Sequence, residues 1–218
     1  MPRKMNRRDF VKTGFAAGMG ATLPAKAFGQ APTVMAPKSI KPLVISDSSG
    51  FRFKNGGPVN CVEKAFEMMV GGADVLDALI AGVNIVELDP EESGVGYGGL
   101  PNEDGVVQLD ACCMDGPTMR AGAVAALEGY MHPAQVAFEV MRRTTRVLLV
   151  GDGAARFAKS LGFPEQNLLT ERARKIWLYW KGQMSGIDDW IAPPDLVDDP
   201  EVQRYIKKNK AIRPTGTI

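Results

Sequence analysis

The chain has 218 residues and a mass of 23.5 kDa, with 45% hydrophobic and 23% charged residues, a balance that allows a buried core of globular size. Its formal charge of +1 gives no electrostatic basis for binding nucleic acid. The charge is unevenly placed, since residues 1–27 hold six of the 26 basic side chains and one of the 25 acidic ones. The rest of the chain therefore carries a net charge of −4.

The first 27 residues have the layout of a targeting segment. Two consecutive arginines, Arg7 and Arg8, precede a weakly apolar stretch at 13–23 that is rich in Gly and Ala, and an A-x-A cleavage site ends at Ala27. This layout resembles a twin-arginine signal, and the apolar stretch is too short to span a bilayer. We expect 1–27 to direct export to the periplasm or beyond, with a basic tail without such a role as the alternative.

A tether, a strand and two helices are expected next. Residues 28–41 are rich in Pro, Lys and Ala without periodicity and read as a tether, and the short apolar run 42–46 predicts a strand. Apolar residues recur with helical spacing in 60–70 and in 74–88. Asp89-Pro90 closes the second helix, because a residue before proline disfavours helical geometry.

Strands and helices alternate in the remainder of the body. A glycine-rich structured loop at 93–105 leads into a largely apolar strand, 106–114, which reads as buried on both faces. The pattern predicts further strands at 121–127 and 146–150 and helices at 133–143, 153–161 and 170–181. The polar, proline-containing segment 183–214 reads as a surface loop or mobile linker. This order indicates an α+β fold with a helix-flanked sheet that has few strands for its helices.

The glycine clusters do not predict a nucleotide site. Residues 94–99 follow a helix and precede a proline turn, and 151–153 lack the third glycine of the dinucleotide-binding pattern. No cofactor is expected.

Two aspartates and the single histidine read as structural residues. Asp110 and Asp115 are five residues apart in a strand and so lie on opposite faces, which disfavours an acid/base pair. Asp115 reads as part of the turn that ends the strand, Asp110 as a hydrogen-bonding partner for backbone, and His132 as a helix-start residue.

Cys61, Cys112 and Cys113 form no C-x-x-C pair and have no histidine near them in sequence, so no metal site is predicted. Two of them could pair in an exported protein. Burial of Cys112 and Cys113 as small apolar residues is the favoured interpretation.

A family resemblance is carried by several segments. They are G-G-A-D-V-L-D-A at 71–78, S-G-V-G-Y-G-G-L-P-N-E-D-G at 93–105, L-D-A-C-C-M-D-G at 109–116, G-A-V-A at 122–125 and L-L-V-G-D-G-A at 148–154, followed by Phe157-Ala158. Together they resemble the glycosylasparaginase and type 2 asparaginase family. The resemblance covers about 42–182 together with Gly216-Thr217-Ile218.

The resemblance implies an N-terminal nucleophile hydrolase with an αββα sandwich, of which only the α-chain half is present. Members cleave themselves before a threonine and then attack the side-chain amide of asparagine or of N4-(N-acetylglucosaminyl)asparagine. By resemblance, Gly216–Thr217 is the autocleavage bond and Thr217 the nucleophile, with its own α-amine as the base. Residues 42–182 are then the α chain, 183–216 the loop to the cleavage site, and 217–218 the start of the β chain.

The same resemblance places the substrate-binding residues in a β chain of the same precursor, the expected partner in a homo-oligomer of αβ units. This chain alone is therefore not expected to turn over substrate. Gly216 stands where glycosylasparaginases usually have Asp, and residues 45–49 lack the Trp that helps to shape their substrate site. The alternative is a non-catalytic exported fragment without a β chain, and a third reading is a small-ligand module built on the glycine-rich loops. The nucleotides after the Ile218 codon discriminate between enzyme and fragment.

Overall fold

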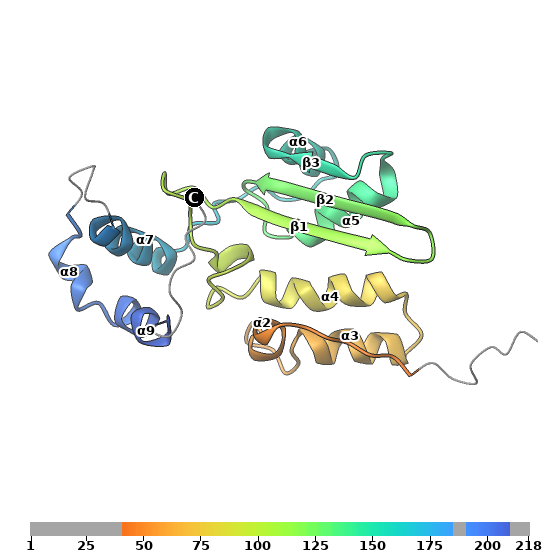
Figure 1. The fold of residues 1–218 in the computed structure, drawn as a ribbon, viewed down its shortest axis with the longest axis horizontal. Helices are drawn as coiled ribbons and strands as arrows, with labels where there is room; N and C mark the ends of the chain where they lie inside the picture. The colour runs from red at the N-terminus through yellow and green to blue at the C-terminus, as the bar shows by residue number, and fades with distance from the viewer. Residues whose placement is uncertain (1–40, 185–190, 210–218) are drawn as a thin grey trace, which may run out of the picture. The chain divides into compact units, whose positions relative to one another are not determined.

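The computed structural model describes residues 41–184 and 191–209. The chain divides after Lys41, and all the helices and strands described here belong to the unit Pro42–Ile218. They form a mixed helix and strand fold (Figure 1), which confirms the predicted α+β class. None of the described helices is long and apolar enough to cross a membrane. The predicted signal 1–27 and nearly all of the tether 28–41 lie outside the described residues.

Three helices precede the sheet, namely α2 (Ser48–Arg52), α3 (Cys61–Val70) and α4 (Val75–Glu87). Asn60 starts α3 with a capping box, in which its side chain accepts the backbone N–H of Glu63 and its own N–H donates to the Glu63 carboxylate. Asp74 caps α4 by accepting from two backbone N–H groups. The two predicted helices are thus confirmed to within one residue at each end.

The sheet has three strands in the order β1-β2-β3. β1 (Leu109–Asp115) pairs antiparallel with β2 (Arg120–Leu127), and β2 pairs parallel with β3 (Leu148–Val150). The parallel step requires a crossover, which α5 (Pro133–Arg143) provides.

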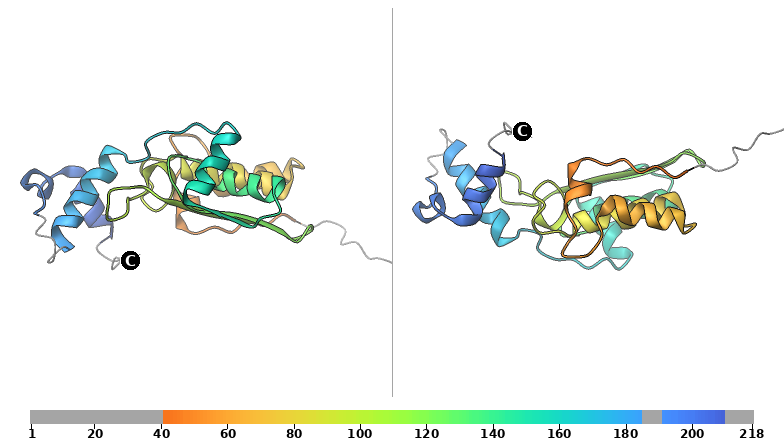
Figure 2. Two further views of the ribbon diagram at one scale, coloured as in Figure 1. Left: turned by 90° about the horizontal axis from the view of Figure 1, so that it is seen from above. Right: turned by 90° about the horizontal axis from the view of Figure 1, so that it is seen from below.

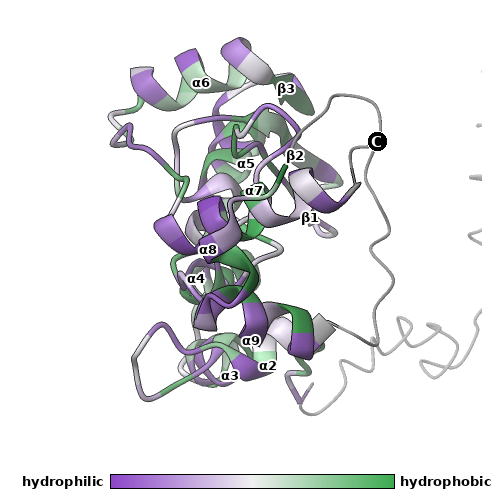
Figure 3. Ribbon diagram, turned by 90° about the vertical axis from the view of Figure 1, so that its left-hand side faces the viewer, coloured by the Kyte–Doolittle hydropathy of each residue, from purple (hydrophilic) through white to green (hydrophobic). Residues whose placement is uncertain are grey.

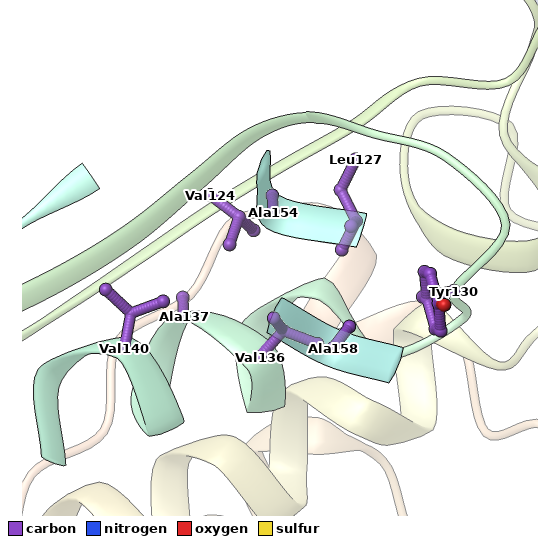
Figure 4. Packing of buried hydrophobic residues seen from close by; sticks show 8 residues of the cluster. All are labelled: Val124, Leu127, Tyr130, Val136, Ala137, Val140, Ala154 and Ala158. Atoms are coloured by element: carbon purple, nitrogen blue, oxygen red, sulfur yellow. The ribbon is translucent and has the colours of Figure 1, made fainter. Parts of the chain in front are cut away.

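Helices α4, α5 and α6 (Gly151–Ser160) bury one face of the sheet (Figure 2). Figure 4 shows the main core cluster, whose side chains come from β2, the turn after it, α5 and α6: Val124, Leu127, Tyr130, Val136, Ala137, Val140, Ala154 and Ala158. A second cluster joins Leu76 and Ile80 of α4 to Cys113 of β1 and Phe138 of α5. In Figure 3, β3 is hydrophobic and α6 alternates between hydrophobic and hydrophilic residues, as expected of an amphipathic helix against a sheet.

The carboxyl-terminal part of the described chain is helical, with α7 (Glu171–Met184), α8 (Pro194–Val197) and α9 (Pro200–Asn209). The prediction of a loop over 183–214 is therefore wrong where α8 and α9 form. Both helices begin with proline, which fits the first turn of a helix because its missing N–H has no partner there. Their buried residues are few (Leu196, Val202 and Tyr205), and the many prolines and charges around them favoured a loop over a helix.

Two strand predictions also need correction. Residues 42–46 form no strand, and Leu43 and Ile45 are largely exposed, because no other described strand pairs with this segment. The strand predicted at 106–114 starts at Leu109 and is not buried on both faces, since burial alternates along β1. Helices cover only one side of the sheet, which leaves Cys112 and Met114 exposed.

Candidate functional site

The residues predicted to carry the chemistry, Gly216 and Thr217, lie outside the described residues. The structure describes the framework that precedes them in the chain. Its polar buried groups gather where α4 ends, in the loop that leads to β1.

Glu87 is a buried carboxyl group in the last turn of α4, with only 3% of its surface exposed. Its Oε1 accepts a hydrogen bond of 2.9 Å from the backbone N–H of Ala134, in the first turn of α5. Burial raises the pKa of Glu87 to about 7, although the hydrogen bond from Ala134 acts in the opposite direction. A carboxyl group with such a pKa gains and loses its proton near neutral pH. In this structure its hydrogen bond with Ala134 links α4 to α5.

Two acceptor atoms share this end of α4. Glu87 Oε2 and Asn84 Oδ1 are buried and have no hydrogen-bond partner among the described residues. The two side chains lie three residues apart on the helix and therefore on the same face. A proton on Glu87 would turn one of its carboxylate oxygens from an acceptor into a donor at this end of the helix.

Two further buried carboxylates fold the loop after α4. Asp89 accepts the backbone N–H groups of Asn55 at 2.8 Å and Glu91 at 3.0 Å, and Glu92 accepts that of Gly94 at 2.8 Å. Backbone N–H groups satisfy both side chains, which fixes the loop against α2 and α4. Among the described residues, no three His, Cys, Asp or Glu side chains are grouped as metal ligands.

The glycines of this loop are required by close packing. Gly96, in the short 3-10 turn η1 (Gly96–Gly98), has φ +63°, and a Cβ there would lie 1.9 Å from the Glu87 carbonyl oxygen. At Gly98 a Cβ would lie 2.2 Å from the carbonyl oxygen of Glu92. The backbone therefore lies directly against the end of α4 and the residues after it, which leaves no room for a side chain at either glycine.

Helix α7 holds the second half of the same loop. The indole Nε1 of Trp177 and the Nζ of Lys181 both donate to the carbonyl of Glu103, at 3.2 and 3.1 Å. The ring of Trp177 lies against Gly105, where φ is +81°. Sequence reasoning missed this contact, because nothing in a local pattern relates residues more than 70 positions apart.

The two aspartates and the histidine have the structural roles that the sequence predicts. Asp110 is exposed rather than buried, and its carboxylate accepts the Ala126 N–H at 2.8 Å, where a β-bulge shifts the register of the β1–β2 pair. Asp115 accepts the N–H of Thr118 at 3.1 Å in the turn after β1. His132 precedes α5 and is half-buried, which lowers its pKa.

All three cysteines are free thiols. Cys61 and Cys113 are buried, and desolvation raises the pKa of each thiol. Cys112 is exposed, so the expectation that both adjacent cysteines are buried is wrong for this one. Neighbouring residues of a strand point to opposite faces of the sheet. Cys113 points toward α5, so Cys112 lies on the face that none of the described helices covers.

That uncovered face of the sheet is apolar. Pairing places Cys112 and Met114 of β1 beside Ala123 and Ala121 of β2, and Leu148 and Val150 of β3 beside Ala123 and Ala125. Met114 is 75% exposed, Leu148 51% and Val150 55%. A contiguous apolar surface of this kind marks a place where another layer of protein packs.

Comparison with known proteins defines the class. The model of the family described as asparaginase matches residues 54–201. The chain is 43% identical over 176 residues to N(4)-(beta-N-acetylglucosaminyl)-L-asparaginase of Elizabethkingia miricola, covering 80% of this chain and 49% of that protein. It is 36% identical over 141 residues to the Mus musculus protein of the same name, covering 65% and 40%. It is 40% identical over 141 residues to plant-type L-asparaginase of Pyrococcus abyssi, covering 63% and 45%.

The three-stranded sheet with helices on one face defines a domain of the α+β class. The chain belongs to the asparaginase family. It spans about half the length of the curated relatives that it matches.

Proposed function

We propose that this chain is the α-chain half of an amidohydrolase that cleaves the side-chain amide of asparagine or of N4-(N-acetylglucosaminyl)asparagine. The names of relatives from three organisms support this activity. The chain spans about half of those relatives, so the proposal includes a β chain that completes the domain, in a homo-oligomer of αβ units.

The observation that carries the proposal is the uncovered apolar face of the sheet, formed by Met114, Leu148, Val150 and the alanines of β2. In an αββα sandwich a second sheet packs on this face, at a spacing of about 10 Å. Residues 42–46 support the same arrangement, because they have the composition of a strand but no strand partner among the described residues. A β chain would supply both the second layer and the missing neighbour.

The proposed chemistry begins with net hydrolysis of the Gly216–Thr217 peptide bond by water, which leaves a carboxylate on Gly216 and frees the α-amine of Thr217. That amine takes the proton of the Thr217 hydroxyl, and Oγ1 attacks the side-chain carbonyl carbon of the substrate. The amide nitrogen leaves as ammonia or as a glycosylamine, with a proton returned from the amine. Water then hydrolyses the resulting ester, which yields aspartate and restores the hydroxyl.

We further propose that the complete protein is exported through residues 1–27. Twin-arginine transport carries folded cargo, which suits an enzyme that cleaves itself only after folding. Replacing Arg7 and Arg8 together by lysine should retain the protein in the cytoplasm, whereas replacing Lys4 by arginine should leave export unchanged.

The test of the function uses the reading frame extended past the Ile218 codon. We expect mass spectrometry to find a fragment that begins at Thr217, together with release of ammonia or glycosylamine from the two substrates. Thr217→Ala should abolish both, while Thr215→Ala, two residues away, should abolish neither. An uncut protein, or full activity in Thr217→Ala, contradicts the proposal. An immediate stop codon instead favours the non-catalytic fragment.

A further inference from the structure

An open pocket of about 370 Å³ lies at the end of the sheet where β2 and β3 begin. Because Ala123 pairs with Leu148 in the parallel β2–β3 ladder, the residues just before these two positions lie side by side. The pocket has a polar lining of Arg120, Thr144, Thr145 and Arg146 and an apolar lining that includes Met119 and Val147. It contains none of the loop residues 88–105 and is a separate feature of the domain.

Arg120 is held in place at this pocket. Its Nη2 donates to the carbonyl of Met141 and, at 3.2 Å, to that of Thr144. These carbonyls belong to the end of α5, where the last carbonyls of a helix have no partner within the helix. The contacts neutralise the negative end of the helix, which would otherwise repel an anion. Among residues 41–184 and 191–209, the other N–H groups of this guanidinium have no acceptor.

The turn between α5 and β3 is also fixed, and it presents two further donors. The Thr144 hydroxyl donates to the Val140 carbonyl at 2.9 Å, and its oxygen accepts the N–H of Arg146 at 2.9 Å. Thr145 and Arg146 are both exposed. In the part of the chain that the structure describes, neither the Thr145 hydroxyl nor the Arg146 guanidinium has a hydrogen-bond partner. The pocket therefore offers two cationic groups and a hydroxyl that can donate to a ligand.

The charge at this end of the sheet is unbalanced. Residues 115–120 and 139–147 contain four arginines and two acids, which leaves an excess of two positive charges. Both acids are already engaged, since Asp115 accepts hydrogen bonds within its own turn and Glu139 pairs with Arg143. Arginines with free N–H groups bind oxyanions well, because their planar fork matches two oxygens of the ligand.

We propose that this pocket binds the phosphoryl group of a phosphate monoester through Arg120, Thr145 and Arg146. At neutral pH such a group carries a charge close to −2, which matches the local excess, and its three terminal oxygens suit donors from three side chains. Met119 and Val147, which are 88% and 58% exposed, give the organic part of the ester an apolar surface. This binding function goes beyond the proposed hydrolase activity, to which none of these residues is assigned.

The experiment titrates the full 218-residue chain with phenyl phosphate at physiological ionic strength, followed by isothermal titration calorimetry. We expect saturable binding of one ligand per chain with a Kd below about 1 mM. Two comparison ligands should each bind at least about fivefold more weakly. Benzenesulfonate has a similar shape but a single charge, and inorganic phosphate lacks the apolar part.

Arg146→Met should weaken the binding of phenyl phosphate about tenfold, because it removes a hydrogen bond between charged groups. Its melting temperature should stay that of the wild type, since the side chain has no partner among the described residues. Arg143→Met is the matched control, because it removes the same charge from a side chain that does not line the pocket. It should change the Kd by less than about twofold, since salt screens exposed charges. Arg146→Lys keeps the charge without the fork, so its Kd should lie between those of the wild type and Arg146→Met.

A titration without saturable binding overturns the inference. Equal binding of benzenesulfonate or of inorganic phosphate also overturns it, because the pocket then does not select the charge or the organic part of a phosphate monoester. Equal weakening by Arg146→Met and Arg143→Met indicates a diffuse attraction to the basic surface and has the same consequence.

Thr145→Val is a second variant, which decides the matter if Arg146→Met lowers the melting temperature. It replaces only the hydroxyl by a methyl group and should weaken binding about threefold. An unchanged affinity in Thr145→Val removes this residue from the site and overturns the proposed set of three donors.

Discussion

The carboxylate of Glu87 and the backbone N–H of Ala134, 47 residues apart in sequence, form a buried hydrogen bond of 2.9 Å. It joins the end of α4 to the start of α5, the two helices that meet over β1. Positions near the amino terminus of a helix favour a negative charge, but burial raises the pKa of Glu87 to about 7, so burial outweighs this effect.

This contact predicts a pH-dependent stability. Because Glu87 has an ordinary pKa of 4.5 when unfolded and about 7 when folded, the folded chain binds the proton more tightly. Stability should therefore be greatest below pH 4.5 and decrease by roughly 3 kcal/mol between pH 4.5 and 7 from this group alone. Glu87→Gln should remove this contribution and be the more stable protein at pH 8, in urea unfolding followed by circular dichroism.

The matched control is Glu63→Gln, because that side chain also accepts a backbone hydrogen bond but is half exposed. Its profile should follow the wild type across the same pH range. If Glu87→Gln keeps the full decrease between pH 4.5 and 7, the buried carboxyl is not its source.

Close packing in the loop predicts that Gly96→Ala is severely destabilising. The new Cβ would meet the Glu87 carbonyl and the residue would need to keep a positive φ, so we expect a loss of roughly 3 kcal/mol or more in the free energy of unfolding. Gly153→Ala is the control, because nothing lies within 4 Å of its Cβ and it sits inside α6. That change should be neutral or stabilise by about 0.5 to 1 kcal/mol. Similar melting temperatures for the two variants would contradict the description of the loop.

The capping box of α3 predicts a smaller effect. Asn60→Ala removes the acceptor for the Glu63 N–H and should cost about 1 kcal/mol, measured by thermal unfolding. Asn60→Ser keeps a side-chain oxygen at the cap, so its free energy of unfolding should decrease by only a few tenths of the loss in Asn60→Ala. If burial of residue 60 alone stabilised the start of α3, the two variants would unfold at the same temperature.

The apolar sheet face predicts a difference between the isolated chain and the complete protein. Met114→Gln should leave the unfolding of the isolated chain within about 0.5 kcal/mol of wild type and reduce its self-association in light scattering. In the complete protein the same change should destabilise, because the second sheet that we propose would cover the side chain. Val124→Ala, on the covered face, should cost roughly 2 kcal/mol in both. Equal losses for Met114→Gln and Val124→Ala in the isolated chain would show that Met114 is already buried.

Local patterns predicted the helices and strands well where apolar spacing was strong. The helix at 133–143 matches α5 at both ends, with proline at its start and buried Val136 and Val140 along one face. The segment 42–46 failed because a strand exists only beside a partner, which a local pattern does not supply. Helices α8 and α9 were missed because the prolines and charge runs of this segment favoured a linker, although Val202, Tyr205 and Ile206 recur at helical spacing in α9.

The site was predictable to a smaller extent. Glycine spacing identified the structured loop, and the alternation of strand faces separated Asp110 from Asp115. The sequence did not predict that Glu87 is buried, because a single acidic residue at the end of an apolar helix is usually exposed to solvent. Its burial results from α5, which comes 47 residues later. Gly216 and Thr217 stay a prediction from resemblance.

Trp177 gives the loop an optical reporter. Its indole lies on Gly105 and donates to the Glu103 carbonyl, so its emission wavelength depends on whether these atoms stay together. With Trp180 and Trp190 replaced by phenylalanine, fluorescence becomes a single-site signal for the 102–106 turn. Loosening of this turn, in a variant or during unfolding, can then be followed without any added dye.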